Sequence, residues 1–240
     1  MIFARAAAAG LATGRGPTVA IDASAFELRA ASFYYVHRAR DRRRGGVGRR
    51  ARRAAHAGPE QLYAQLYAPH PQLTVAVHTA SHLIAGALPG EGPTADVPAF
   101  EPVLRQAVTL LRVSAVVADA GFDCEAAHRL CHRTFRIRRT AIRLNPRHTG
   151  QRWPQTPARR AMRRQFPWRV YRRRQQAESV FSRNKRRLGV ALTARTAAHQ
   201  REELVLRVLT HNLMILLVPP ANLFNRAGQT PSGHEWGQTP

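Results

Sequence analysis

The chain has 240 residues, of which 44% are hydrophobic, so it is long and apolar enough to bury one substantial core. Its 38 basic residues against 14 acidic ones give a net charge of +24, which restricts its partners to nucleic acid or another anionic surface. The sequence lacks an uncharged apolar run of membrane-spanning length and has two cysteines, too few for a disulfide framework, so we expect no membrane association and a reducing cytoplasm.

The first 60 residues contain one predicted strand between irregular segments. Residues 1–17 are expected to be a loose, disordered lead-in. The β-branched run TVAID at 18–22 is predicted to be a strand that ends at an acid. Residues 38–60 begin with nine arginines between Arg38 and Arg53, interspersed with glycines, which indicates a solvated loop that orders on an anionic partner.

A hairpin, a helix and a second strand follow. QLTVAVHTA at 72–80 and HLIAGAL at 82–88 are separated by a short turn and predict an antiparallel hairpin. A helix is expected to begin near Pro98. VSAVVAD at 113–119 predicts a buried strand that again ends at an acid.

The second half of the chain is predicted to be mainly helical. CEAAHRLCHR at 124–133 indicates a helix, and the alternating FRIRRTAIRL at 135–144 indicates a strand. A basic, proline-containing connection at 145–168 leads to a helix that carries Glu178. A final buried helix is expected over residues 197–218.

These elements predict one mixed α/β domain over residues 18–218, followed by a disordered tail at 219–240. Two of its strands end alike, since TVAID and AVVAD both finish on an aspartate, Asp22 and Asp119. Ligand sites gather beyond the carboxyl ends of strands, so these acids would lie side by side if the strands are parallel neighbours. Mg²⁺ suits such a pair. The alternative is that each aspartate only favours a turn.

A third acid stands in basic surroundings. Between positions 126 and 201 the chain has 21 arginines, one lysine and a single carboxylate. Codon bias towards arginine accounts for part of this excess but not for the scarcity of acids. One predicted helix face collects four residues at i, i+3, i+7 and i+14: Tyr171, Arg174, Glu178 and Lys185. The plain alternative is an i, i+4 ion pair between Arg174 and Glu178.

The spacing Y-(2)-R-(3)-E-(6)-K of these four residues resembles the signature of DDE transposases of the insertion-sequence-four superfamily. ADAGFD at 118–123 resembles the second-aspartate motif of that family, and AIDASAFELRAASFYYVHR at 20–38 resembles its first-aspartate region. RTAAHQREELVLRVLTHNL at 195–213 is similar to its final helix. The resemblance covers nearly the whole predicted domain.

The resemblance implies a ribonuclease-H-like fold, with a mixed sheet flanked by helices, and a two-metal reaction that cleaves and transfers DNA strands. Asp22 would bridge two Mg²⁺ ions, for which Mn²⁺ substitutes; Asp119 would complete one site and Glu178 the other. Water would attack in end cleavage, and the freed 3′-hydroxyl would attack in joining. Tyr171, Arg174 and Lys185 would contact the DNA backbone of the element ends.

The implied partners are double-stranded DNA, as element ends and target, and further copies of the chain in a homo-oligomer at the bacterial nucleoid. Trp153 and Trp168 are expected to belong partly to the core, with stacking on unpaired bases as the alternative. Only 21 residues precede Asp22, so we expect an N-terminally truncated copy. Two other hypotheses are a basic nucleic-acid-binding remnant without catalysis and a ribonuclease-H-like nuclease that does not join strands.

A second cluster competes as a metal site. One face of the predicted helix at 124–133 carries soft ligands at i, i+4 and i+7 with a further histidine beside them: Cys124, His128, Cys131 and His132. Structural zinc needs four convergent ligands, usually from two elements. We therefore expect helix packing and surface histidines here.

Overall fold

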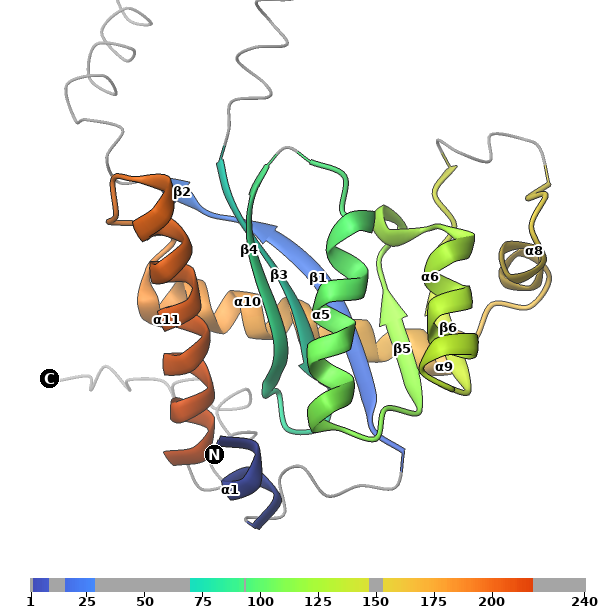
Figure 1. The fold of residues 1–240 in the computed structure, drawn as a ribbon, viewed down its shortest axis with the longest axis horizontal. Helices are drawn as coiled ribbons and strands as arrows, with labels where there is room; N and C mark the ends of the chain where they lie inside the picture. Colours follow the sequence, from blue (N-terminus) through green and yellow to red (C-terminus); the bar gives the residue numbers. More distant parts are fainter. Residues whose placement is uncertain (1, 9–15, 29–69, 93, 147–152, 218–240) are drawn as a thin grey trace, which may run out of the picture.

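A computed structural model describes residues 2–8, 16–28, 70–92, 94–146 and 153–217 of the protein. The predicted Arg-rich loop, its upstream flank and the C-terminal tail lie outside these residues. The described part is built on a central sheet with helices on both of its faces (Figure 1).

The five strands of the sheet lie in the order β4-β3-β1-β5-β6. Their bounds are Thr18–Ala25 for β1, His70–His78 for β3, Ile84–Gly92 for β4, Ala115–Ala118 for β5 and Arg139–Ile142 for β6. β3 pairs antiparallel with β1 and β4, whereas β5 is parallel to β1 and β6. This is the ribonuclease-H-like mixed sheet that the sequence predicts, and β3 with β4 is the predicted hairpin.

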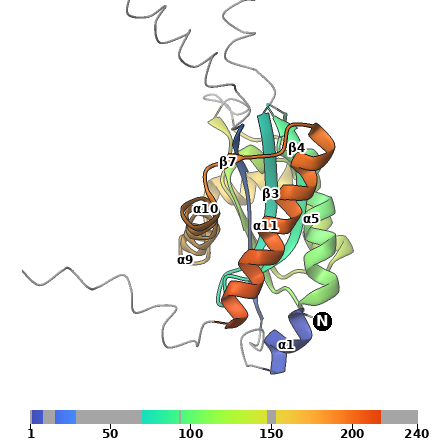
Figure 2. The ribbon, with the colours of Figure 1, turned by 90° about the vertical axis from the view of Figure 1, so that its left-hand side faces the viewer.

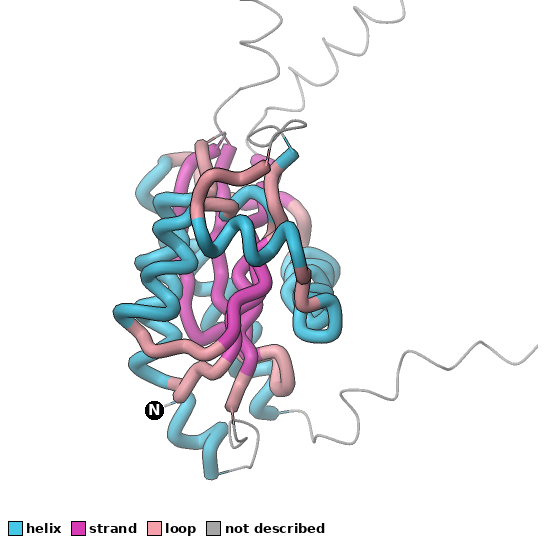
Figure 3. The backbone as a smooth tube through the Cα atoms, turned by 90° about the vertical axis from the view of Figure 1, so that its right-hand side faces the viewer, coloured by secondary structure: helices cyan, strands magenta, loops and turns pink. Residues whose placement is uncertain are grey.

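The central strands are apolar because both of their faces are covered. α5 (Val97–Leu110) packs on one face and α10 (Gln175–Leu188) on the other (Figures 2 and 3). Val19 and Ile21 of β1 belong to the core beneath α5, while Ala20 between them belongs to the core beneath α10. Alternate residues of a strand point to opposite faces, so one apolar run serves both layers.

The last helix, α11 (Ala197–Leu217), packs along the edge strand β4. Asn212 accepts a hydrogen bond from Ile84 N at 2.8 Å and donates one to Ile84 O at 2.9 Å, which satisfies backbone groups of this edge. The predicted helix is confirmed, but its predicted burial is wrong on one face, where five apolar side chains are exposed: Val205, Leu206, Leu209, Leu213 and Leu217. Within the described residues, every helix is too short or too polar to cross a membrane.

Two helices form where the sequence predicts irregular chain. α1 (Ile2–Ala8) lies in the predicted lead-in, where Ala6 packs with Leu83 and Ile215. α8 (Pro157–Arg164) lies in the predicted basic connection and has no buried residue. Both helices are too short for a sequence pattern to predict: α1 depends on its packing against α11, and α8 is held by hydrogen bonds from the backbone of Ala158 and Arg159 to Glu125.

The region after β5 also differs from the prediction. The predicted helix at 124–133 is divided into α6 (Glu125–Arg129) and a π-helical segment (η2, Leu130–Thr134). The predicted strand at 135–144 is limited to β6, because Arg136 adopts a positive φ of 56° and interrupts the extended chain.

Candidate active site

The register of β1 and β5 brings the first two predicted acids to one level. Ile21 pairs with Ala118 in parallel, so Asp22 of β1 and Asp119, which directly follows β5, lie side by side. The prediction that the first strand ends at Asp22 is wrong, because β1 continues to Ala25 in its pairing with β3. Asp119 begins a 3₁₀ turn, and its Oδ1 accepts the N–H of Ala120 at 2.7 Å. The sequence predicts that the two aspartates lie side by side if their strands are parallel neighbours, and β1 and β5 are parallel neighbours.

The Asp22 carboxylate is held in a mostly buried position, with 14% of its side chain exposed. Its Oδ1 accepts the N–H of Ala23 at 3.0 Å. Burial raises the pKa of Asp22 to about 6; the nearby Arg174 guanidinium opposes this shift, and the negative charges of Asp119 and Glu178 add to it. The carboxyl is therefore poorly stabilised as an anion by the protein alone.

The third acid is joined to Asp22 through an arginine. Glu178 lies in the first turn of α10, after a 3₁₀ turn (η3, Arg172–Arg174) that interrupts the predicted continuous helix. Arg174 Nη1 is 3.6 Å from Asp22 Oδ2, and its Nη2 forms an ion pair with Glu178 Oε1. Burial lowers the pKa of Arg174, but the carboxylates led by Asp119 raise it above its usual value. One guanidinium thus neutralises part of the charge of three acids.

The other two signature residues lie at different depths. Tyr171 ends α9 (Trp168–Tyr171), is 9% exposed, and packs edge-on against Phe166 with ring centroids 5.0 Å apart. Lys185 is half-buried, with Nζ 5.1 Å from the centre of the Phe26 ring. Tyr171 is therefore mainly a core residue beneath the acids, and the DNA contacts predicted for Tyr171 and Lys185 stay predictions.

The donor chemistry of the three acids fits a hard divalent cation, because Mg²⁺ prefers carboxylate oxygens. In this structure the cation bonded to two of them is Arg174, which leaves an excess of negative charge. Across the described ranges, no set of three or more His, Cys, Asp or Glu side chains is placed to hold a metal ion as it stands. The three acids are thus of the right chemical type for a divalent cation and lie near one another, and Arg174 contacts two of them, Asp22 and Glu178.

The competing cysteine and histidine cluster is divided between core and surface, since His128 and Cys131 are buried whereas His132 is exposed. His128 is fully buried, with Nδ1 2.8 Å from Thr140 Oγ1, and His132 Nε2 lies 3.1 Å from the same hydroxyl. Cys131 is fully buried, and burial raises the pKa of its thiol to about 12. The prediction of helix packing is consistent with these contacts, whereas the prediction of a surface histidine is wrong for His128.

A groove of about 760 Å³ begins at Asp119. Trp168 lines it with 56% of its surface exposed, while its ring packs against Phe166 and Tyr171, which is consistent with a partly core position. Trp153 is 58% exposed, with its ring centre 5.9 Å from Arg163 Cζ, so the prediction that it is partly core is wrong. Three basic residues also line the groove: Arg143, Arg163 and Arg164. Sequence reasoning missed them as site residues, because they come from the end of β6 and from α8, whose helix was not predicted.

These features define a class of protein: a ribonuclease-H-like domain of strong positive charge, with one acid within β1, a second directly after the neighbouring parallel strand β5 and a third on an adjacent helix. A family model described as the transposase DDE domain matches residues 15–213, which is more than four-fifths of the chain. The chain belongs to this family, which confirms the predicted transposase class and implies action on DNA. No curated protein and no solved structure matches the chain.

Proposed function

We propose that this chain is a DDE transposase of the insertion-sequence-four superfamily, in which Asp22, Asp119 and Glu178 are the catalytic residues. It cleaves DNA at the ends of an insertion sequence and transfers the freed strand to target DNA. The parallel register of β1 and β5 carries this proposal, because it aligns the two aspartates, while Arg174 contacts both Glu178 and Asp22.

Two Mg²⁺ ions, or Mn²⁺ in their place, would bind these acids, with Asp22 shared, Asp119 completing one site and Glu178 the other. Their chemistry is to activate the attacking oxygen and to stabilise the leaving oxygen of the phosphoryl transfer. Backbone hydrogen bonds orient the two aspartates: the N–H of Ala23 donates to Asp22 Oδ1, and the N–H of Ala120 donates to Asp119 Oδ1. The second oxygen of each carboxylate would bind a cation.

The arginines around the acids would hold the DNA. Arg174 lies in the turn before the helix of Glu178 and Lys185 on that helix, and the groove beside Asp119 supplies further guanidinium groups for phosphates. Exposed Trp168 offers a stacking surface for an unpaired base at the wall of this groove. A homo-oligomer would bring two element ends together at the nucleoid of the bacterial cytoplasm.

The test is calorimetric titration of Mn²⁺ into the complex of protein with element-end DNA. Asp22→Asn, Asp119→Asn and Glu178→Gln should each weaken Mn²⁺ binding at least tenfold. Glu101→Gln is the matched control for Glu178, since Glu101 is similarly exposed and also forms an i, i+4 ion pair, with Arg105. The control should bind Mn²⁺ like the unaltered protein.

The outcomes separate the alternatives. Joining of cleaved ends to a second duplex, lost in all three variants, supports the transposase. Cleavage without joining would make the chain a ribonuclease-H-like nuclease. DNA binding without Mn²⁺ binding that depends on these acids would make it a basic DNA-binding remnant.

A further inference from the structure

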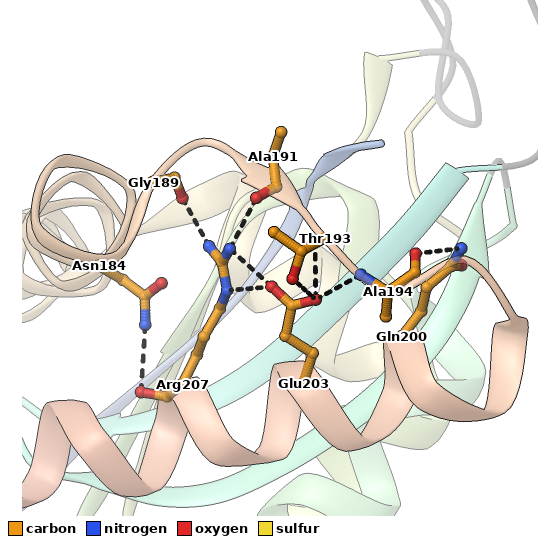
Figure 4. Close-up of polar contacts among 8 residues, drawn as sticks. All are labelled: Asn184, Gly189, Ala191, Thr193, Ala194, Gln200, Glu203 and Arg207. Carbon is orange, nitrogen blue, oxygen red and sulfur yellow. Dashed lines mark hydrogen bonds and ion pairs between the residues drawn. The ribbon is translucent and has the colours of Figure 1, made fainter. Parts of the chain in front are cut away.

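A second arginine–carboxylate pair, Glu203 and Arg207 of α11, lies at the opposite end of α10 (Figure 4). Only 7% of the Arg207 side chain is exposed. Its guanidinium donates to Gly189 O at 2.5 Å, to Ala191 O at 2.7 Å and to Glu203 Oε1 at 2.9 Å. The two carbonyl groups belong to the segment that follows α10, so Arg207 fastens this segment to α11.

The second oxygen of Glu203 holds the next residues of the same segment. Oε2 accepts the N–H groups of Thr193 and Ala194, each at 2.9 Å, and the Thr193 hydroxyl at 3.2 Å. Burial by itself would raise the pKa of Glu203, but these hydrogen bonds and Arg207 lower it, so the carboxylate is well stabilised as an anion. We call Glu203, Arg207 and the residues 189–194 that they bind the latch.

The latch connects the helix of Glu178 with the strand of Asp22. α10 ends at Gly189, whose positive φ of 90° turns the chain out of the helix. The chain then forms β7 (Ala191–Leu192), which pairs in parallel with β2 (Glu27–Leu28), the strand that follows β1 almost directly. Glu203 and Arg207 thus hold the only described strand pairing between the segment after α10 and the extension of β1.

Side-chain contacts reinforce the same connection. Phe26, between β1 and β2, is 2% exposed, and its ring centre lies 5.1 Å from Lys185 Nζ and 5.6 Å from Arg207 Cζ. Asn184 of α10 donates to Arg207 O at 3.4 Å. α10, α11 and the end of β1 therefore meet at Arg207.

We propose that Glu203 and Arg207 are positioning residues, which fix α10 relative to β1 and thereby set Glu178 opposite Asp22. This inference rests on the proposed function, since it assigns the latch to the ion site that Glu178 completes. Glu178 lies 11 residues before Gly189, about 16 Å along a rigid helix, so a small tilt at the latch displaces the carboxylate. Asp119 directly follows β5, away from the latch, so the ion site that it completes should not depend on the latch.

The test is Mn²⁺ titration of the full chain with element-end DNA, with the two ions resolved. Glu203→Gln should weaken the ion that Glu178 completes about tenfold and leave the ion between Asp22 and Asp119 within twofold. In a Glu178→Gln background, Glu203→Gln should have no further effect on the remaining ion. Arg201→Gln is the control on the same helix, because Arg201 forms an exposed ion pair with Glu91, and it should leave both affinities unchanged.

A purely stabilising latch gives a different result. Equal loss of both ions in Glu203→Gln, or unchanged affinity for both, overturns the positioning role. If Glu203→Gln does not fold by circular dichroism, Thr193→Val removes one of its contacts, and the same selective loss is then expected at about twofold. Absence of acid-dependent Mn²⁺ binding in the unaltered protein overturns the proposed function instead, so the two failures are distinguishable.

Discussion

The two ends of α10 carry the same types of residue in opposite electrostatic conditions. At its beginning, Arg174 faces Asp22 and Glu178 with Asp119 nearby, and we call these four residues the Arg174 cluster. At its end, the latch pairs one arginine with one glutamate. Burial leaves the pKa of Asp22 raised to about 6 in the first, whereas hydrogen bonds to Glu203 lower its pKa in the second.

The difference shows how a structural ion pair is distinguished from a site. In the latch, both oxygens of Glu203 have N–H partners and the guanidinium also binds backbone carbonyls, so no charge is left to attract a ligand. In the Arg174 cluster, one guanidinium serves three acids and half of the Glu178 side chain is exposed. The proposed Mg²⁺ site rests on this unbalanced negative charge in a chain of net +24.

The largest expected contrast is in stability. Arg207→Met leaves the Glu203 carboxylate and two carbonyls without their partner in a buried place, and should lower the free energy of unfolding by about 3–5 kcal/mol. Arg174→Met should cost no more than about 1 kcal/mol, because Glu178 is half exposed and the 3.6 Å between Arg174 Nη1 and Asp22 Oδ2 is too long for a hydrogen bond. Urea unfolding in EDTA measures the free energy of unfolding of both variants. Equal losses in the two variants would contradict the contrast between the two ends of α10.

The next effect is a pH dependence of opposite sign at the two ends. Asp22 has a pKa of about 6 in the folded protein and 3.8 in the unfolded chain, so the folded state favours its protonated form. The contribution of Asp22 to the free energy of unfolding is therefore fully present below about pH 4 and is lost as pH rises through 6. Asp22→Asn should therefore gain about 2 kcal/mol of unfolding free energy relative to the unaltered protein between pH 4 and pH 8, in EDTA.

Glu203 should respond in the other direction. Its pKa is lowered from 4.5, so its stabilisation is present above that pH and is lost as pH falls through the folded-state pKa. The deficit of Glu203→Gln should thus shrink in acid, in the same urea series. Glu101→Gln should follow the unaltered protein throughout, and a shared pH profile of all three variants would contradict the assignment.

The smallest effect concerns Arg174 and the metal. Because its guanidinium already contacts Asp22 and Glu178, Arg174→Gln should tighten Mn²⁺ binding in the absence of DNA about threefold. Arg172→Gln, on the same turn and exposed, is the control and should have no effect. Calorimetry without DNA measures this; weaker Mn²⁺ binding in Arg174→Gln would show that the arginine supports the ion rather than competing with it.

Much of the fold could be predicted because local pattern and tertiary environment agree. TVAID and AVVAD are continuous apolar runs that suit strands buried on both faces, and the hairpin strands and α5 begin where turn and proline signals indicate. α1, α8 and the π-helical segment were missed, since such short helical segments take their stability from contacts with neighbouring elements. The i, i+4 pairing of Arg174 with Glu178 was also available from sequence.

By itself, the sequence determined most strands of the main sheet, the main helices and the positions of the three acids, because hydrophobic period and residue type are local properties. The tertiary structure decided which acids meet. The register of β1 with β5 aligns Asp22 with Asp119, and the latch holds α10 through the carbonyls of Gly189 and Ala191. Strand register and backbone acceptors depend on contacts between segments far apart in the chain, and no spacing of side chains records them.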